Sequence, residues 1–274
     1  MILWTPEQLR ERLDDPKLRI LDVRRGEAFS QGHVPGARHF SVYGLNVYDT
    51  DPAPLKSFVQ TWAFLLGRCG IGPDDEVVVY EDRSGMSAAR AFWFLEYLGH
   101  ERVHVLDGGL EAWKQAGFEV ATEAELPQPV PYAPKLREDR VAGYQDVLAA
   151  IGSEDQLVLD TRSDGEWFGT QAMASRGGTI PGAIHLEWTN HLAADGRFKS
   201  ADELRDLFAS RGIGVDREVI ALCQAGYRSA HAYVALRLMG HPRVRNYVGS
   251  WGEWGNREGM PVVRPEDPVL APMA

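Results

Sequence analysis

The chain has 274 residues, of which 44% are hydrophobic and 25% are charged, and its formal net charge is -10. This composition is typical of a soluble globular protein with room for one or two domains. The negative charge argues against nucleic acid or an anionic membrane surface as a partner, and the 2 cysteines argue against a disulfide framework or an all-cysteine metal site.

The N-terminus mixes acidic and basic residues within its first ten positions and lacks the apolar core of a signal peptide. No later stretch is long and apolar enough to span a bilayer. We therefore expect a cytoplasmic protein. Because the net charge repels anions, a small anionic substrate would have to be attracted by local arginines and backbone amides.

Short apolar strands alternate with helical segments along the chain. Strands rich in β-branched residues are predicted over 20–23, 77–80 and 103–106, and helices over 5–13, 57–68, 87–98 and 110–116. Farther along, strands are predicted over 157–159 and 218–222, and a helix over 229–239. This alternation predicts an α/β fold in which helices cover both faces of a small parallel sheet.

The second half of the chain repeats the first. Gly70-Ile-Gly72, which precedes the strand at 77–80, returns as Gly212-Ile-Gly214 before the strand at 218–222. Further matches in the same order are Leu21-Asp-Val-Arg24 with Leu159-Asp-Thr-Arg162, Val34-Pro-Gly-Ala37 with Ile180-Pro-Gly-Ala183, and Leu98-Gly-His100 with Met239-Gly-His241. These matches indicate a duplication.

A proline-rich stretch separates the two copies. Residues 121–139 include prolines at 127, 129, 131 and 134, a composition that suits an extended connector. We therefore predict an N-terminal domain over 1–120, a linker over 121–139 and a C-terminal domain over 140–274.

The loop Cys223-Gln-Ala-Gly-Tyr-Arg-Ser229 joins the strand at 218–222 to the following helix. It places the Cys223 thiol at a helix N-terminus, where unpaired N–H groups and the macrodipole favour a thiolate. Asp160 ends another strand, and ligands of parallel sheets bind beyond the carboxyl ends of the strands. A buried structural cysteine is the alternative, but the glycine and arginine in the loop favour a nucleophile.

The rest of this loop is predicted to bind an anionic substrate through backbone amides and one guanidinium. These residues are Gln224, Ala225, Gly226, Tyr227, Arg228 and Ser229. Arg228 either contacts the anion or pairs with a carboxylate that braces the loop, and Ser229 is expected to cap the helix. His231 is expected to be a partly exposed helical residue rather than a base.

With these motifs in order, the chain resembles a two-domain rhodanese, a thiosulfate sulfurtransferase. The resemblance depends on the duplication, on Asp160-Thr-Arg162 with Glu166 downstream, on Gly178-Thr-Ile-Pro-Gly-Ala183, on the Cys223 loop and on Gly249-Ser-Trp-Gly-Glu-Trp-Gly255. It implies two tandem rhodanese-like domains, of which the second is catalytic and the first degenerate, with the active site where they meet.

The resemblance also implies the chemistry. Cys223 would take the outer sulfur of thiosulfate as a persulfide and pass it to cyanide or a thiol, and we expect neither a cofactor nor a metal. Asp160, Arg162 and Trp251 would support the site. Trp251, Trp254 and Trp188 either line its entrance or, as aromatic residues usually do, fill the core.

The first copy has a carboxylate where the second has the sulfur. The halves are one residue out of step, so Glu81 matches Cys223 when the strands are aligned and Asp82 matches it when the helices are aligned. The stretch 81–87 is therefore expected to support the site as one of its walls. Cys69, at the end of a helix, is predicted only to pack.

Three other functions stay open. Relatives that use 3-mercaptopyruvate typically have Cys-Gly-Ser-Gly-Val-Thr in this loop, from which the present loop departs. A rhodanese-like cysteine phosphatase or arsenate reductase would need a loop one residue longer. A non-catalytic carrier or interaction module is the last alternative, and the intact Cys223 loop argues against it.

Overall fold

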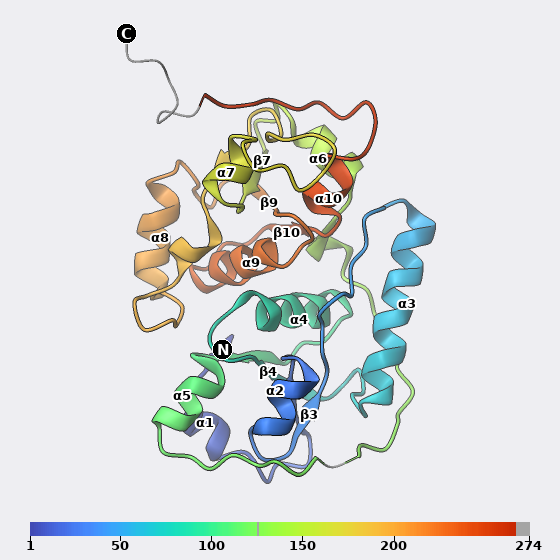
Figure 1. Ribbon diagram of the computed structural model, residues 1–274, viewed down its shortest axis with the longest axis vertical. Coiled ribbons are helices and arrows are strands. Elements are labelled where there is room, and N and C mark those ends of the chain that lie inside the picture. The colour runs from blue at the N-terminus through green and yellow to red at the C-terminus, as the bar shows by residue number, and fades with distance from the viewer. Residues whose placement is uncertain (125, 267–274) are drawn as a thin grey trace. The chain divides into compact units, whose positions relative to one another are not determined.

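The computed structural model describes residues 1–124 and 126–266, which form two compact units (Figure 1). The first unit contains Met1–Leu45, the described part of Leu55–Arg140, and His191–Ser200. The second contains Asn46–Pro54, Val141–Asn190 and the described residues from Ala201 onward. Each unit thus includes a short segment from the other sequence repeat, whereas the predicted domains are each one continuous stretch of the chain. Residue 125 of the predicted linker and 267–274 of the predicted C-terminal domain lie outside the described residues.

The first unit is built on a five-stranded parallel sheet with the strand order β1-β5-β4-β2-β3. Its strands are β1 (Leu3–Trp4), β2 (Leu18–Asp22), β3 (Ala37–His39), β4 (Glu76–Tyr80) and β5 (Val103–Leu106). The helices are α1 (Pro6–Arg10), α2 (Gly26–Gln31), α3 (Pro52–Arg68), α4 (Met86–Tyr97), α5 (Gly109–Gln115) and the 3-10 helix η1 (Glu138–Arg140), and α3 begins in the segment that clusters with the second unit.

The second unit repeats this sheet, with the order β6-β10-β9-β7-β8. Its strands are β6 (Val141–Ala142), β7 (Gln156–Asp160), β8 (Ile184–His185), β9 (Glu218–Leu222) and β10 (Val244–Tyr247). The helices are α6 (Tyr144–Ala150), α7 (Asp164–Trp167), α8 (Ala201–Ala209), α9 (Arg228–Leu238), α10 (Ser250–Trp254) and the 3-10 helix η2 (Trp188–His191). The equal strand orders confirm the predicted α/β fold.

The central strand β9 shows why the sequence folds this way. Ile220 and Leu222 lie in a hydrophobic cluster with residues of α6 and α10, whereas Val219 and Ala221, equally buried, point to the opposite face. A strand that is apolar at every position is what a sheet covered on both faces requires. Asp160 pairs with Leu222 in register, so Asp160 and Cys223 lie at the same edge, as predicted.

Two expectations about α9 are wrong. The N-cap of α9 is Tyr227, and Ser229 lies inside the helix because its hydroxyl donates to Asn246 Oδ1 at 2.7 Å instead of capping. His231 is fully buried rather than partly exposed, because α9 packs on the sheet and the Trp188 ring meets His231 edge-on at 5.0 Å. Across residues 1–124 and 126–266, no helix has the length and apolarity to cross a bilayer.

Candidate active site

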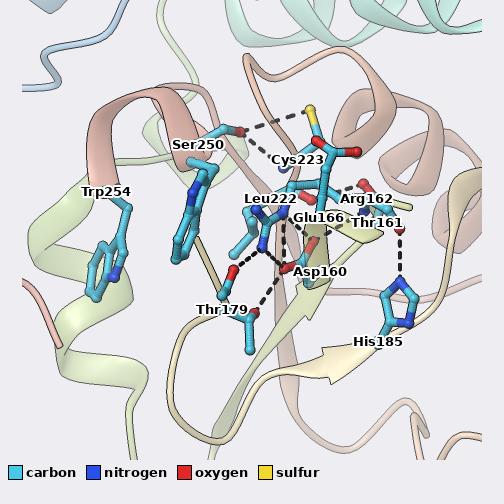
Figure 2. Close-up of polar contacts among 12 residues, drawn as sticks. Asp160, Thr161, Arg162, Glu166, Thr179, His185, Leu222, Cys223, Ser250 and Trp254 are labelled. Carbon is cyan, nitrogen blue, oxygen red and sulfur yellow. Dashed lines mark hydrogen bonds and ion pairs between the residues drawn. The ribbon is translucent and has the colours of Figure 1, made fainter. Parts of the chain in front are cut away.

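Cys223 follows β9 directly, and one N–H group and two hydroxyl groups lie around its sulfur. The Gly226 N–H lies 3.1 Å from Sγ, the Ser229 hydroxyl oxygen 3.5 Å and the Ser250 hydroxyl oxygen 4.0 Å. Figure 2 shows Ser250 beside the sulfur. Gly226 has a φ of 80°, a left-handed conformation that glycine adopts at little cost, and this turns its N–H toward the sulfur. The loop therefore presents an N–H donor to the sulfur, which favours the charged form of the thiol.

The electrostatics of the loop favour the thiolate. Burial alone would raise the pKa of Cys223, whose side chain is only 1% exposed. The positive charge of Arg228 is the largest influence in the opposite direction, and the pKa of Cys223 lies below that of an ordinary thiol. A larger thiolate fraction at neutral pH favours the role of nucleophile that was predicted for Cys223.

Arg228 is held by a carboxylate. Its Nη1 and Nη2 donate to Glu166 Oε2 and Oε1 at 2.6 and 2.8 Å. Burial would raise the pKa of Glu166, but the Arg228 guanidinium and the Ser163 hydrogen bonds lower it to about 2. The bracing alternative is thus present in the structure. The Arg228 side chain keeps 19% of its surface exposed, and anion binding by it stays a prediction.

Asn246, which the sequence reasoning missed, ties the loop to β10. Its Nδ2 donates to the Gly226 carbonyl at 3.1 Å, and its Oδ1 accepts from Ser229 at 2.7 Å. The side chain is fully buried. A buried side-chain amide needs such partners. The sequence did offer a signal for this role, because an asparagine is unusual within a strand such as Val244–Tyr247.

The N-terminal end of α10 holds the other side of the loop, and its role was also missed. The N–H groups of Trp251 and Gly252 donate to the carbonyls of Cys223 and Gln224, both at 2.9 Å. Ser250 Oγ accepts from the Cys223 N–H at 3.1 Å and donates to the Tyr247 carbonyl at 2.7 Å. Ser250 has a φ of 51°, an unfavourable conformation for serine that these contacts impose.

Asp160 and Arg162 form a buried ion pair below the loop (Figure 2). The Arg162 guanidinium donates to Asp160 and to the Gly178 carbonyl, the latter at 2.7 Å, and the Thr179 hydroxyl donates to Asp160 at 2.8 Å. Arg162 also lies 4.2 Å from the centre of the Trp251 ring. Because 1% or less of either side chain is exposed, the contacts are those of a structural support.

Comparison with known proteins identifies the fold family. The family model for the rhodanese-like domain matches residues 5–116 and again 144–257. The chain belongs to the rhodanese family. This confirms the predicted tandem arrangement of two rhodanese-like domains.

Among relatives of this rhodanese, the sulfur carrier protein TtuD of Thermus thermophilus is 35% identical, over 97% of this chain and 98% of the relative. A thiosulfate sulfurtransferase of Azotobacter vinelandii is 34% identical, over 94% and 95%. The crystal structure of SseA from Escherichia coli, described as a 3-mercaptopyruvate sulfotransferase, has a TM-score of 0.78 at 28% identity, over 92% of this chain and 99% of that one.

In the first rhodanese domain, Glu81 stands where Cys223 stands in the second. Glu81 follows β4 directly, and the distance from it to the start of α4 equals that from Cys223 to the start of α9. The one-residue offset falls within the helices, because α4 has 12 residues and α9 has 11. Of the two alternatives, the structure therefore favours Glu81, whereas Asp82 is exposed and pairs with Arg24.

The Glu81 carboxylate occupies the N-terminus of its own helix. Its Oε1 accepts from the N–H groups of Ser87 and Ala88 at 2.7 and 2.8 Å. Burial outweighs these bonds and raises the pKa of Glu81 to about 7. A carboxyl group thus fills the place that the sulfur takes in the second domain.

The first rhodanese domain also contains a copy of the buried ion pair. Arg24 donates to Asp22 at 2.6 Å and to the Gly32 carbonyl at 2.7 Å, matching the contacts of Arg162 with Asp160 and Gly178. The pair is present beside a loop without a nucleophile. This favours a supporting role for Asp160 and Arg162 in the second domain.

The remaining candidates divide between surface and core. Gln224, Ala225 and Tyr227 are partly exposed, and the Gln224 side chain donates to the Met173 carbonyl at 3.0 Å. Trp251 and Trp254 are fully buried and therefore belong to the core.

Cys69 and Trp188 have different surroundings. Cys69 lies 3.6 Å from the His39 carbonyl, and burial raises the pKa of its thiol, which suits the packing role predicted for it. Trp188 is partly exposed, and its ring contacts His231.

Proposed function

We propose that this rhodanese is a thiosulfate sulfurtransferase that carries the sulfane sulfur as a persulfide on Cys223. The observation that supports this most is the Cys223 sulfur at the carboxyl end of β9, with the Gly226 N–H of the following loop directed at it from 3.1 Å. The relatives named as thiosulfate sulfurtransferases, which match this chain along most of its length, agree with it.

The first half-reaction needs only a thiolate. The Cys223 thiolate attacks the outer sulfur of thiosulfate, a new S–S bond forms, and the S–S bond of thiosulfate breaks as sulfite leaves with the electron pair. The enzyme then holds a persulfide with one negative charge. Because no proton moves, no general base is required.

The second half-reaction returns the enzyme to its starting state. Cyanide attacks the terminal persulfide sulfur, thiocyanate forms, and the Cys223 thiolate leaves with the electron pair. The N–H of Gly226 is placed to stabilise negative charge at either stage. The partly exposed Gln224, Ala225, Tyr227 and Arg228 are the candidates for contact with the sulfonate oxygens.

A comparison of three donors tests this function. Initial rates are measured with thiosulfate and with 3-mercaptopyruvate, each with cyanide, and with an aryl phosphate, using Cys223→Ser as the blank. We expect the highest kcat/KM with thiosulfate. A higher kcat/KM with 3-mercaptopyruvate would instead indicate the activity for which SseA is named. Aryl phosphate hydrolysis that depends on Cys223 would indicate a phosphatase.

The physiological acceptor is proposed to be a thiol, for which cyanide substitutes in the assay. The two half-reactions use no cofactor. The cytoplasmic location, the exclusion of nucleic acid and membrane partners, the placement of the site at the meeting of the domains and the domain limits 1–120, 121–139 and 140–274 stay predictions.

A further inference from the structure

A segment of the N-terminal repeat, Asn46–Pro54, belongs to the second unit. Its anchor is Thr50, which is 5% exposed. The Thr50 N–H donates to Glu253 Oε1 at 2.7 Å, and its hydroxyl oxygen lies 3.0 and 2.8 Å from Oε1 and Oε2. The same hydroxyl accepts from the Tyr144 N–H at 3.0 Å. One threonine therefore joins the segment to both α6 and α10.

Glu253 is a buried carboxylate on α10, with 2% of its surface exposed. Besides Thr50, it accepts from the Tyr247 hydroxyl at 2.9 Å and from Arg257 at 3.2 Å. Arg257 in turn donates to Asp51 of the same segment at 2.8 Å. A buried charge needs several donors, and Thr50 supplies a large share of those that Glu253 has.

Tyr48 of the segment packs directly on α10. A Cβ atom at Gly252 would lie 2.4 Å from the Tyr48 ring and 2.9 Å from the Gln224 carbonyl oxygen. Only glycine therefore permits this approach. The Gly252 N–H donates to that same carbonyl of the catalytic loop at 2.9 Å.

The N-terminal end of α10 connects these contacts to the sulfur. The N–H groups of Trp251 and Gly252 hold the carbonyls of Cys223 and Gln224, both at 2.9 Å. The Gly226 N–H, two residues farther along the same loop, lies 3.1 Å from the Cys223 sulfur. A rotation of α10 would therefore shift the loop that carries this donor.

We propose that Thr50 is a positioning residue for sulfur transfer: it fixes α10 through Glu253, and α10 fixes the loop whose Gly226 N–H donates to Cys223. The effect on turnover rests on the proposed function, whereas the effect on the thiolate does not. The N-terminal repeat thus contributes to the reaction through a side chain that touches neither the sulfur nor the substrate.

The test is Thr50→Val, which keeps the shape of the side chain and removes its hydroxyl. The pH profile of Cys223 alkylation by iodoacetamide is measured together with kcat and KM for thiosulfate. We expect the profile to shift to higher pH and kcat to fall roughly two- to thirtyfold, the range of such indirect couplings, with a smaller change in KM. Thr50→Ser should restore both readouts.

Thr61→Val is the matched control, because the exposed Thr61 hydroxyl donates only within α3, to the Ser57 carbonyl at 2.9 Å. A lower melting temperature of Thr50→Val with an unchanged alkylation profile would overturn the proposal. If Thr50→Val does not fold, Tyr48→Ala replaces it, since Tyr48 is 50% exposed, and an unshifted profile there would equally overturn it. If Thr50→Val shifts the alkylation profile but the wild type does not use thiosulfate, the proposed sulfur donor is refuted and the positioning role of Thr50 is not.

Discussion

The Arg228 guanidinium and the Glu166 carboxylate form a two-pronged ion pair next to the sulfur of Cys223. Burial acts to raise the pKa of Cys223, and Arg228 is the largest of the opposing influences. Glu166 holds this cation in place. The pair therefore joins the bracing of the loop, one of the two roles predicted for Arg228, to the activation of the nucleophile.

Replacement of the cation should weaken both binding and activation. Arg228→Ala leaves the Glu166 carboxylate near the sulfur, so the apparent pKa of Cys223 alkylation should rise. If Arg228 also binds the sulfonate, kcat/KM for thiosulfate should fall roughly ten- to a hundredfold. The double variant Arg228→Ala with Glu166→Gln should recover part of the alkylation rate at pH 7. No recovery would show that Glu166 does not act on the sulfur.

The two cysteines should behave differently. Cys223→Ser should abolish sulfur transfer to cyanide, whereas Cys69→Ser should retain nearly all of it, because burial raises the pKa of the Cys69 thiol, which lies 3.6 Å from the His39 carbonyl. Steady-state rates of the two variants check this. Comparable losses in both would rule out a single nucleophile.

Glu81 should make stability depend on pH. Its pKa of about 7 in the folded protein lies above its ordinary value of 4.5, so its stabilising contribution is complete below pH 4.5 and is lost as the pH rises through 7. Between pH 4.5 and 8 the wild type should lose up to about 3 kcal/mol relative to Glu81→Gln, an upper bound since the residue keeps partial solvent contact. Urea unfolding of both proteins across this range measures the difference, and parallel curves would contradict the prediction.

A fragment that begins at Arg140 should be unstable or largely inactive. It lacks Asn46–Pro54, and its buried Glu253 would lose the Thr50 donors, at a cost of about 1–3 kcal/mol for each unsatisfied group. Melting curves and thiosulfate turnover check this. A matched fragment with 46–54 fused to its N-terminus should recover stability, and full activity of the unfused fragment would refute the requirement.

The sequence predicted those parts of the fold and site that depend on local pattern. The apolar run at 218–222 gave β9, and the strand-to-helix step placed Cys223 at the carboxyl edge beside Asp160. Ser229 was misread because cap preference is local, whereas its actual acceptor, Asn246, lies on another strand. Thr50 was missed for the same reason, since nothing near it in sequence indicates a partner such as Glu253.

The bond between Thr50 and Glu253 also bears on the timing of folding in the cell. The two residues are 203 positions apart, a separation that takes roughly 10–40 s to synthesise at about 5–20 residues per second. Throughout that interval Asn46–Pro54 is outside the ribosome without its acceptor, and the second unit is incomplete. Such a distant contact forms late, so we expect the catalytic loop to acquire its final geometry only after Glu253 has been synthesised, long after the first sheet has had time to assemble.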